Sequence, residues 1–330
     1  MKPMSNGRRT ALRAMPAALA LAAGTSARAA EPGAFPSKPI RLLVPFPTGS
    51  GTDLAARIIA AEAARAAGQS VVVENKPGAN GIIATGQVAR AAPDGYTMLI
   101  TSNSHVANRH LFKRLPYDPI ADFKAVAMYR RPTPLILAVG PASKHRSIAD
   151  LAAAARAPGA KLSYASGNSS SHVAGELFRQ VTGADMLYVP FKGNAEAMTE
   201  VAAGRVDMIF ADLGAFLDVG RGLKLVPLVV TGPEPLAALE GVPASPDAGL
   251  GRLSISSWGV FLVPSATPDA VADRLHQLVA AAVRTPAMQQ YLVASSSVAH
   301  APPRAEIEAF LRSELTYWGA IIQKAGIEPQ

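Results

Sequence analysis

Residues 40–53 of the chain read IRLLVPFPTGSGTD. The apolar, branched residues that begin this stretch predict a β-strand, and the proline, glycine, serine and threonine residues after them predict a loop. The alanine-rich residues 54–67 that follow predict a helix. In an α/β sheet this order places a glycine loop and a helix N-terminus at the carboxyl end of a strand, where ligands tend to bind.

The chemistry of this first loop favours an anion. Gly49 and Gly51 allow the backbone to approach a ligand closely, and the first amides of the helix are free donors that favour a negative group. Thr52 or Asp53 is expected to cap the helix. We therefore predict a cradle for an anion, most simply a carboxylate. The loop residues expected to bind it are Phe46, Thr48, Gly49, Ser50, Gly51, Thr52 and Asp53.

Other functions of such a loop have signatures that this sequence lacks. The dinucleotide fingerprint needs a third glycine where Leu54 stands, and no Gly-x-x-x-x-Gly-Lys-Ser/Thr motif occurs in the chain. Ser50 is not framed as Gly-x-Ser-x-Gly, the motif of a hydrolase nucleophile elbow. Taken alone, the loop is also compatible with an ordinary tight turn between a strand and a helix.

The composition excludes several classes of function. The chain has 330 residues, 49% hydrophobic and 17% charged, as expected for a folded protein of one or two domains. It has no cysteine, which excludes disulfides, thiolate metal sites, iron–sulfur clusters and cysteine nucleophiles. The formal charge is +8, but residues 1–29 hold five basic and no acidic residues, which leaves +3 for the rest. Because that remainder has no dense basic run with interleaved aromatic residues, we expect no nucleic acid partner.

Residues 1–29 have the pattern of a secretory signal peptide. A basic start precedes an apolar stretch of roughly ten residues, too short to span a bilayer, which needs about 20. The small-x-small sequence Ala27-Arg28-Ala29 predicts cleavage near Ala29 and an exported mature protein. The pair Arg8-Arg9 leaves export by the general or the twin-arginine route open.

Beyond the first loop, predicted strands and helices alternate, which indicates an α/β protein with a mainly parallel sheet. The predicted strands are residues 71–75, 96–101, 126–129, 135–139, 162–166, 186–191, 206–212, 225–230 and 255–263. The predicted helices are residues 82–92, 147–156, 173–181, 195–203, 269–284, 287–294 and 304–325, with a short helix ending at residue 111. The glycine loop recurs about 120 residues later, which suggests two α/β lobes with a cleft between them.

The second glycine loop, residues 166–172, reads SGNSSSH and again lies between a predicted strand and a predicted helix. It offers amides, hydroxyls and a helix N-terminus, all suited to carboxylate oxygens. Facing the first loop, it could hold the other end of a small dicarboxylate without a buried lysine or arginine. A serine-rich turn with redundant caps is the alternative. The residues expected to bind are Ser166, Gly167, Asn168, Ser169, Ser170 and His172.

Four further candidates stand near predicted strand ends. Ser102 and Ser104 lie in a polar loop after a strand, Lys192 follows a strand and could be a cation of the cleft, and Asp212 ends an apolar strand. Asp212 is expected to accept a hydrogen bond from a ligand or to cap the next helix. Lys192 could equally be a solvated loop residue.

Catalysis and metal binding find little support. A secreted α/β hydrolase would use Ser50, or a serine of 169–171, with His172, but no serine has an activating context. His105 and His110 lack an acidic or histidine partner for zinc. We therefore expect no enzyme activity, no cofactor and no metal.

Taken together, these segments resemble the tripartite tricarboxylate transporter substrate-binding proteins, the Bug (Bordetella uptake gene) or TctC-like family. Matching segments run through nearly the whole mature chain in a specific order and spacing. They include residues 35–40, 44–57, 73–79, 92–97, 115–119, 164–168, 172–178, 189–193 and 204–207. Each is weak alone.

The resemblance implies a Venus-flytrap fold like that of periplasmic binding proteins, with a hinge and a ligand cleft. Residues 30–132 and 253–330 would form lobe 1, and residues 133–252 would form lobe 2. It also implies a periplasmic, monomeric protein without enzyme activity. Such a protein captures a small carboxylate by lobe closure. It then delivers that acid to integral membrane subunits of a tripartite tricarboxylate transporter. A secreted α/β hydrolase and an orphan ligand sensor of the same fold are the alternatives.

The sequence departs from the family pattern in three places. Ser50 stands where relatives commonly have a third glycine, and the second loop is two residues shorter than the commonest form. Residues 243–249 replace a common Pro-Thr-x-x-Glu-x-Gly motif. These departures bear on the identity of the ligand more than on the fold.

Overall fold

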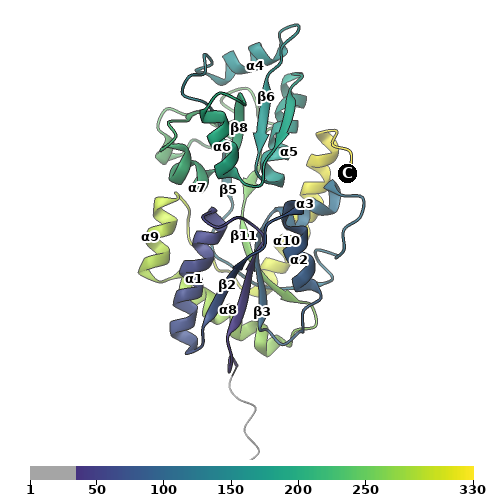
Figure 1. The fold of residues 1–330 in the computed structure, drawn as a ribbon, viewed down its shortest axis with the longest axis vertical. Coiled ribbons are helices and arrows are strands. Elements are labelled where there is room, and N and C mark those ends of the chain that lie inside the picture. Colours follow the sequence, from purple (N-terminus) through teal and green to yellow (C-terminus); the bar gives the residue numbers. More distant parts are fainter. Residues whose placement is uncertain (1–34) are drawn as a thin grey trace, which may run out of the picture. The chain divides into compact units, whose positions relative to one another are not determined.

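The computed structural model of the protein describes residues 35–330, so the predicted signal peptide and its cleavage site lie outside the described residues. Residues 35–330 contain two β-sheets, each covered by helices (Figure 1). The predicted α/β class is confirmed. We call the first sheet with its helices the first lobe, and the second sheet with its helices the second lobe. No helix among residues 35–330 is both long enough and apolar enough to span a membrane.

The first lobe is built from both ends of the described chain. Its sheet has the strand order β2-β1-β3-β11-β4, with β1 parallel to β2 and β3, and β11 antiparallel to β3 and β4. Its strands are β1 (Ile40–Val44), β2 (Val71–Asn75), β3 (Thr97–Ser102), β4 (Phe123–Met128) and β11 (Gly259–Pro264). Its helices are α1 (Gly51–Ala67), η1 (Ala79–Gly81), α2 (Ile82–Ala89), α3 (Ser104–Leu111), α8 (Asp269–Val283), α9 (Pro286–Ala294) and α10 (Arg304–Lys324).

The second lobe uses the middle of the chain. Its sheet has the order β10-β5-β8-β6-β7, with β9 paired to β5. Its strands are β5 (Thr133–Val139), β6 (Ser163–Ser166), β7 (Leu187–Pro190), β8 (Met208–Asp212), β9 (Val226–Val230) and β10 (Ser256–Ser257). Its helices are α4 (Ile148–Arg156), α5 (Ser169–Thr182), α6 (Asn194–Ala202), α7 (Leu213–Ala215), η2 (Phe216–Gly220) and η3 (Ala237–Leu239).

Both sheets are mixed, which corrects the expectation of a mainly parallel sheet. Strand β5 runs antiparallel to β8 and β9, and β11 runs antiparallel to both of its neighbours. These are the strands by which the chain crosses from one lobe to the other. A crossing strand enters its sheet from the opposite end, so it runs against the parallel βαβ strands already there. The predicted single strand 255–263 is two strands, because β10 pairs with β5 and β11 pairs with β3 and β4.

The alternation of side chains along β1 explains how one strand serves two cores. Leu42 belongs to a buried cluster with Ile59 of α1 and Leu275 of α8, on one face of the first sheet. Leu43 points to the other face and belongs to a cluster that includes Trp318 of α10. That second cluster continues through Trp258 into the second lobe, where it includes residues of β5, β6 and α5. The two lobes therefore share one hydrophobic core along their common side.

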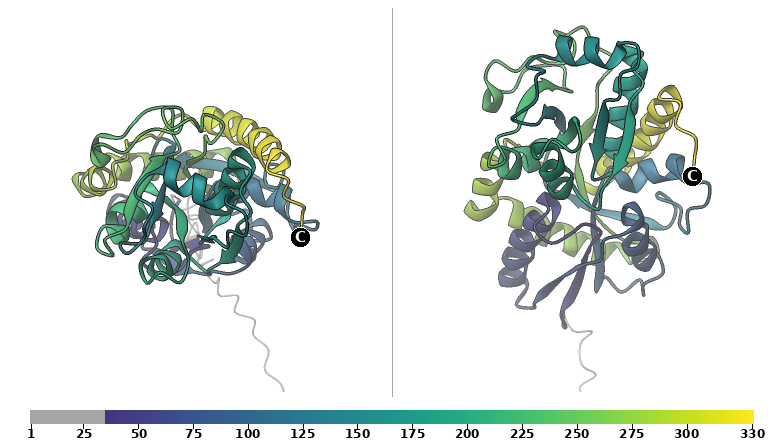
Figure 2. Two further views of the ribbon diagram at one scale, coloured as in Figure 1. Left: turned by 90° about the horizontal axis from the view of Figure 1, so that it is seen from above. Right: turned by 45° about the horizontal axis from the view of Figure 1, so that its top comes forward.

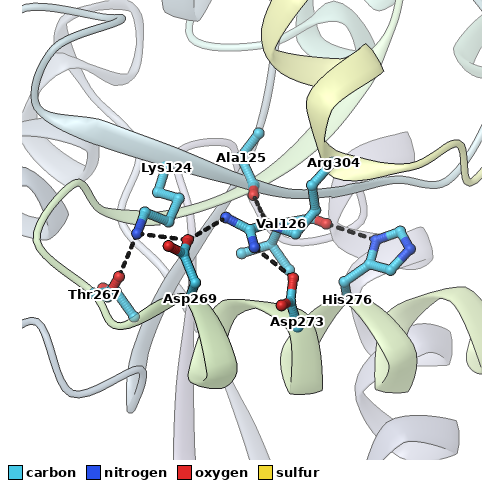
Figure 3. Close-up of polar contacts among 8 residues, drawn as sticks. All are labelled: Lys124, Ala125, Val126, Thr267, Asp269, Asp273, His276 and Arg304. Atoms are coloured by element: carbon cyan, nitrogen blue, oxygen red, sulfur yellow. Dashed lines mark hydrogen bonds and ion pairs between the residues drawn. The ribbon is translucent and has the colours of Figure 1, made fainter.

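The C-terminal helix α10 returns to the first lobe and is fixed there at its start. Figure 3 shows Arg304, the first residue of α10, between strand β4 and helix α8. Its guanidinium donates to the carbonyl oxygen of Ala125 at 2.9 Å and to Asp269 at 3.2 Å, and it pairs with Asp273. Along its length α10 contacts α3 and β4, and it also contacts α5 of the second lobe (Figure 2). The resemblance had implied this return.

Candidate functional site

A cavity of about 530 Å³ opens between the two lobes, at the ends of strands β1 and β8. Its first-lobe wall consists of the first loop together with Ser102, Tyr129, Arg130, Tyr291, Ser295 and Ser297. Its second-lobe wall includes Gly167, Asn168, Asp212, Ser257 and residues at the starts of α6 and α7. Across its mouth, a Cβ atom placed on Gly193 would lie 3.3 Å from Cγ of Pro47. The loops of the two lobes therefore meet around one cavity.

Helix α1 begins three residues earlier than predicted, inside the first loop. Ser50, and not Thr52 or Asp53, is the N-cap, and its hydroxyl accepts a hydrogen bond from the Asp53 amide at 3.3 Å. Gly49 has a φ of +82°, a conformation that glycine adopts without steric cost. The hydroxyl of Tyr291 donates to the carbonyl oxygen of Gly51 at 2.7 Å and fixes the loop from α9.

The carboxylate of Asp53 holds this loop from behind and is fully buried. It accepts hydrogen bonds from the Gly49 amide at 2.8 Å, from Asn75 at 2.8 Å and from Arg57 at 3.0 Å. Burial by itself would raise the pKa of Asp53, but the hydrogen bonds from Arg57, Gly49 and Asn75 together outweigh burial and lower the pKa below its ordinary value. Asp53 is therefore ionised at neutral pH and acts on the shape of the loop.

In the second loop, Asn168 is the N-cap of α5. Its side-chain oxygen accepts from the Ser171 amide at 2.9 Å, while its side-chain amide donates to Asp212 at 2.8 Å. Asn194, the first residue of α6, donates to the same oxygen of Asp212 at 2.7 Å. Asp212 therefore ties the starts of α5 and α6 together. Its side chain does not cap α7, the other role considered from the sequence.

Both loops present unused amides at helix N-termini. Within residues 35–330, the amides of Gly51 and Thr52 at the start of α1 have no protein acceptor, nor do those of Gly167 and Asn168 before α5. All four residues line the cavity. The N-terminus of each helix also carries the positive end of the helix dipole. Both helices are long enough for this effect, with 17 residues in α1 and 14 in α5. The cavity is thus suited to an anion reached from both lobes.

A smaller cavity of about 170 Å³ lies beside the first. The two share Phe46, Gly167, Asn168 and Lys192 in their walls. The smaller one is otherwise lined by residues after β1, by the turn at 78–81, and by Ser104 and Ser169. It extends the site toward the starts of α3 and α5.

The structure brings most of the predicted site residues to the larger cavity. Those that line it are Phe46, Thr48, Gly49, Ser50, Gly51, Thr52, Ser102, Gly167, Asn168, Lys192 and Asp212. The predicted residues that do not line it are Asp53, Ser104, Ser166, Ser169, Ser170 and His172. Of these, Ser104 and Ser169 line the smaller cavity.

The serines of the second loop do not line the larger cavity, because α5 begins at Ser169 and not at residue 173 as predicted. Their hydroxyls point into the contact between the lobes. Ser169 donates to Asn108 at 3.0 Å and Ser170 donates to Asn103 at 3.3 Å, both at α3 of the first lobe. His172 is buried and stacks on Tyr188, with ring centroids 4.1 Å apart. Burial lowers the pKa of His172, so its ring is neutral at neutral pH.

Sequence reasoning missed a set of cavity residues on other segments. Tyr129 and Arg130 follow β4, Ser257 ends β10, and Tyr291 lies in α9. One of these residues is a cation: Arg130 is half-buried and lines the cavity, whereas the sequence suggested that the two loops could hold an acid without a buried lysine or arginine. In the sequence, these residues are recognisable only as polar or aromatic residues next to predicted strands. The sequence did not show that the chain crosses between the lobes there, under the first loop.

The constellation of a hydrolase is not assembled. Ser50 caps α1 at the cavity, whereas His172 lies behind the wall and its ring makes no hydrogen bond with a serine within residues 35–330. No cluster of three or more potential metal ligands occurs among the described residues.

Two α/β lobes, two crossing strands and a cavity between paired helix N-termini define a two-lobed solute-binding protein. The chain belongs to the tripartite tricarboxylate transporter family of receptors (TctC), whose pattern it matches over residues 55–327. It is 36% identical to a UPF0065 protein from the tcbD-tcbE intergenic region of a Pseudomonas species, covering 85% of this chain and 83% of the relative. A UPF0065 protein of Bordetella pertussis is 32% identical over all of both chains. The predicted family is confirmed, and it is a family of receptors and not of enzymes.

Solved structures agree with this assignment. The periplasmic binding protein BugD has a TM-score of 0.84 at 27% identity, covering 90% of this chain and 100% of that one. Rpa4515 of R. palustris, solved with adipate, has a TM-score of 0.84 at 30% identity with the same coverage. MatC of Rhodopseudomonas palustris, solved with bound malate, has a TM-score of 0.81 at 26% identity, covering 87% of this chain and 100% of that one. The predicted binding-protein fold is confirmed.

Proposed function

We propose that this protein is a periplasmic receptor that captures a small organic carboxylate in the cavity between its lobes. The observation that carries the proposal is the convergence of unused amides from the N-termini of α1 and α5 on one cavity. A carboxylate can accept several hydrogen bonds and is stabilised by the positive ends of both helices. The ligands of two relatives, adipate and malate, are both small carboxylates and support this class of ligand.

In this proposal the ligand joins the two lobes. An acid that accepts from Gly51 or Thr52 on one side and from Gly167 or Asn168 on the other stabilises the closed arrangement over an open one. The lobes would move about the two crossing segments, between β4 and β5 at residues 129–132 and between β10 and β11 at residue 258. Contacts between the lobes are already present beside the smaller cavity, such as the hydrogen bond from Ser169 to Asn108.

The cellular setting follows from the family. The protein is proposed to be exported by the signal peptide of residues 1–29, cleaved near Ala29, and to act as a monomer. Its closed form would be recognised by integral membrane subunits of a tripartite transporter. BugD, a protein of the same fold at 27% identity, is a periplasmic binding protein and supports this location.

A ligand screen with the mature chain, residues 30–330, tests the proposal. Mono-, di- and tricarboxylates are added one at a time, and the melting temperature is followed. At one hundred times its Kd, an acid should stabilise the protein by about 2.7 kcal/mol and raise the melting temperature by roughly 5 °C. Calorimetric titration of the strongest acids then gives the stoichiometry, expected to be one. Uncharged sugars of similar size serve as controls. A panel in which no acid exceeds the sugars would refute the proposal.

A further inference from the structure

Arg130 is held in the cavity wall by neutral groups alone. Its guanidinium donates to the carbonyl oxygen of Ser257 at 2.9 Å, to the Ser257 hydroxyl at 3.1 Å and to the hydroxyl of Thr133. A longer contact of 3.5 Å joins its Nε to the Tyr129 hydroxyl. These bonds fix the plane of the guanidinium and leave part of its donor capacity unused, since arginine carries five N–H groups.

No carboxylate pairs with Arg130 among the residues of the described chain. Six other arginines, at positions 41, 57, 65, 179, 205 and 304, each form an ion pair with an acid. Asp212 of the cavity wall attracts Arg130 electrostatically but forms no ion pair with it, and its Oδ2 accepts from the side-chain amides of Asn168 and Asn194. Glu196 and Asp218 also line the cavity but are exposed. A half-buried cation that no carboxylate contacts is costly, and an anionic ligand in contact with it would relieve that cost.

Arg130 also lies where the chain crosses between the lobes. It lies between β4 of the first lobe and β5 of the second, on one crossing segment. Its partner Ser257 lies in β10, on the other crossing segment, immediately before the chain enters β11. The guanidinium therefore bridges both connections between the lobes while it faces the ligand space. The wall around it includes Tyr129 and Tyr291, which present aromatic surface.

We infer that Arg130 binds a second anionic group of the ligand, so that the receptor selects dicarboxylates over monocarboxylates of the same length. The inference rests on the proposed function, in which the first carboxylate is held by the amides of α1 and α5. One carboxylate then lies on the helix N-termini and the other on Arg130. One N–H of the guanidinium remains unused, and this charged donor binds a carboxylate more strongly than it binds a neutral end of a ligand.

Matched pairs of acids test this directly. The probes are succinate with butyrate, glutarate with pentanoate, and adipate with hexanoate, titrated by calorimetry into the mature protein. The diacid of the best pair should bind at least about thirty-fold more tightly than its monoacid partner. In Arg130→Gln this preference should vanish through loss of diacid affinity, with monoacid affinity within about three-fold of the original.

Two further variants make the result specific. Arg131→Gln removes an exposed charge from the neighbouring residue and should keep the full preference. Arg130→Lys keeps a cation and should keep part of it, which separates loss of charge from damage to the crossing segments. Melting temperatures without ligand establish that each variant folds.

Several outcomes would overturn the inference. Monoacids that bind as tightly as diacids would do so, as would a preference that survives in Arg130→Gln. An equal weakening of both acids in that variant would show that Arg130 acts only on the structure of the site. If none of the six acids nor any acid of the wider screen binds, the proposed function itself fails. Binding of monoacids alone would leave the proposed function standing and remove only the role of Arg130.

Discussion

The two glycine loops have similar sequences but use their polar residues differently. In the first loop the ligand wall is the loop itself, residues 46–52, and its one buried carboxylate, Asp53, holds the wall from behind. In the second loop only Gly167 and Asn168 reach the larger cavity. The serines that follow are already helical and bond to the opposite lobe. The same composition therefore builds a binding wall in one lobe and a contact between lobes in the other.

The glycines of the two loops differ in the same way. Gly49 is needed for its positive φ, and a Cβ there would meet no atom within 4 Å. Gly167 is needed for space, because its Cβ would lie 2.2 Å from the backbone of residues 193 and 194. The backbone conformation of the loop requires glycine in the first lobe, and close packing requires glycine in the second. Four substitutions or changes of condition test this contrast.

The largest effect is expected at Asp53. Asp53→Ala leaves the amides of Gly49 and Asn75 without their acceptor and should lower the free energy of unfolding by about 3 kcal/mol. It should also abolish ligand-induced stabilisation, because the loop that lines the cavity is no longer held. Urea unfolding with and without ligand measures both effects. The control Asp94→Ala, at an exposed acid, should stay within about 0.5 kcal/mol of the original protein. A similarly small change at Asp53 would contradict the role of that carboxylate.

A smaller loss, but still a large one, is expected from Gly167→Ala. The added methyl group must displace the backbone at the start of α6, and overpacking of this kind costs roughly 2 to 3 kcal/mol. The shift should also disturb Asn194 and with it the hydrogen bond to Asp212. Thermal unfolding and the affinity for a cognate acid should both suffer. A variant as stable as the original would show that the second loop is not closely packed.

Lowering the pH should reduce the stability of the protein as its buried titratable groups take effect one after another. Burial lowers the pKa of His105 to about 4, so below pH 6.5 the unfolded chain binds a proton that the folded protein refuses. At pH 5 this costs about 2 kcal/mol of stability. The lowered pKa of His172 acts in the same direction in the second lobe. The pKa of Asp53 is lowered in the folded protein, so its carboxylate contributes stability at every pH above its ordinary pKa. That stability is lost as the pH falls through the lowered pKa.

Urea unfolding between pH 7.5 and pH 3 measures this sequence of losses. His105→Gln keeps a donor for the carbonyl of Pro119, to which the ring bonds at 2.8 Å, and removes the titrating group. The loss between pH 6.5 and pH 5 should therefore shrink in this variant. An unchanged pH profile would assign the acid sensitivity to other groups.

The smallest change in stability is expected from Gly49→Ala. A positive φ costs a residue with a Cβ about 1 kcal/mol, and no steric clash is added. Gly159→Ala is a matched control, because Gly159 also has a positive φ and open space but lies away from the cavity. The two variants should lose similar stability, and only Gly49→Ala should weaken the binding of an acid. Equal binding by both would show that the conformation of the first loop does not matter to the site.

Local patterns predicted the elements of the fold and one wall of the site. Strand β2 occupies the predicted residues 71–75, and Ser147 caps α4 as expected, because these features depend on neighbours in the sequence. The start of α5 was missed because Ser169, Ser170 and Ser171 are weak helix formers that read as a loop. Their helical state is stabilised by the cap of Asn168 and by contacts with the other lobe.

The opposite wall could not be predicted for a different reason. Arg130, Ser257 and Tyr291 come together only because two chain crossings and α9 meet beneath the first loop. The bond from Arg130 to Ser257 spans 127 positions of sequence, and that from Tyr291 to Gly51 spans 240. No local sequence pattern predicts contacts between residues so far apart in the sequence. The predicted strand 255–263 also concealed Ser257, since the break between β10 and β11 depends on which sheet each half joins.

A crystal structure of the protein with its best-binding acid would show where the ligand lies. We expect the acid in the cavity of about 530 Å³, with one carboxylate accepting from amides of both lobes, among Gly51, Thr52, Gly167 and Asn168. An acid bound outside that cavity, or held by one lobe alone, would contradict it.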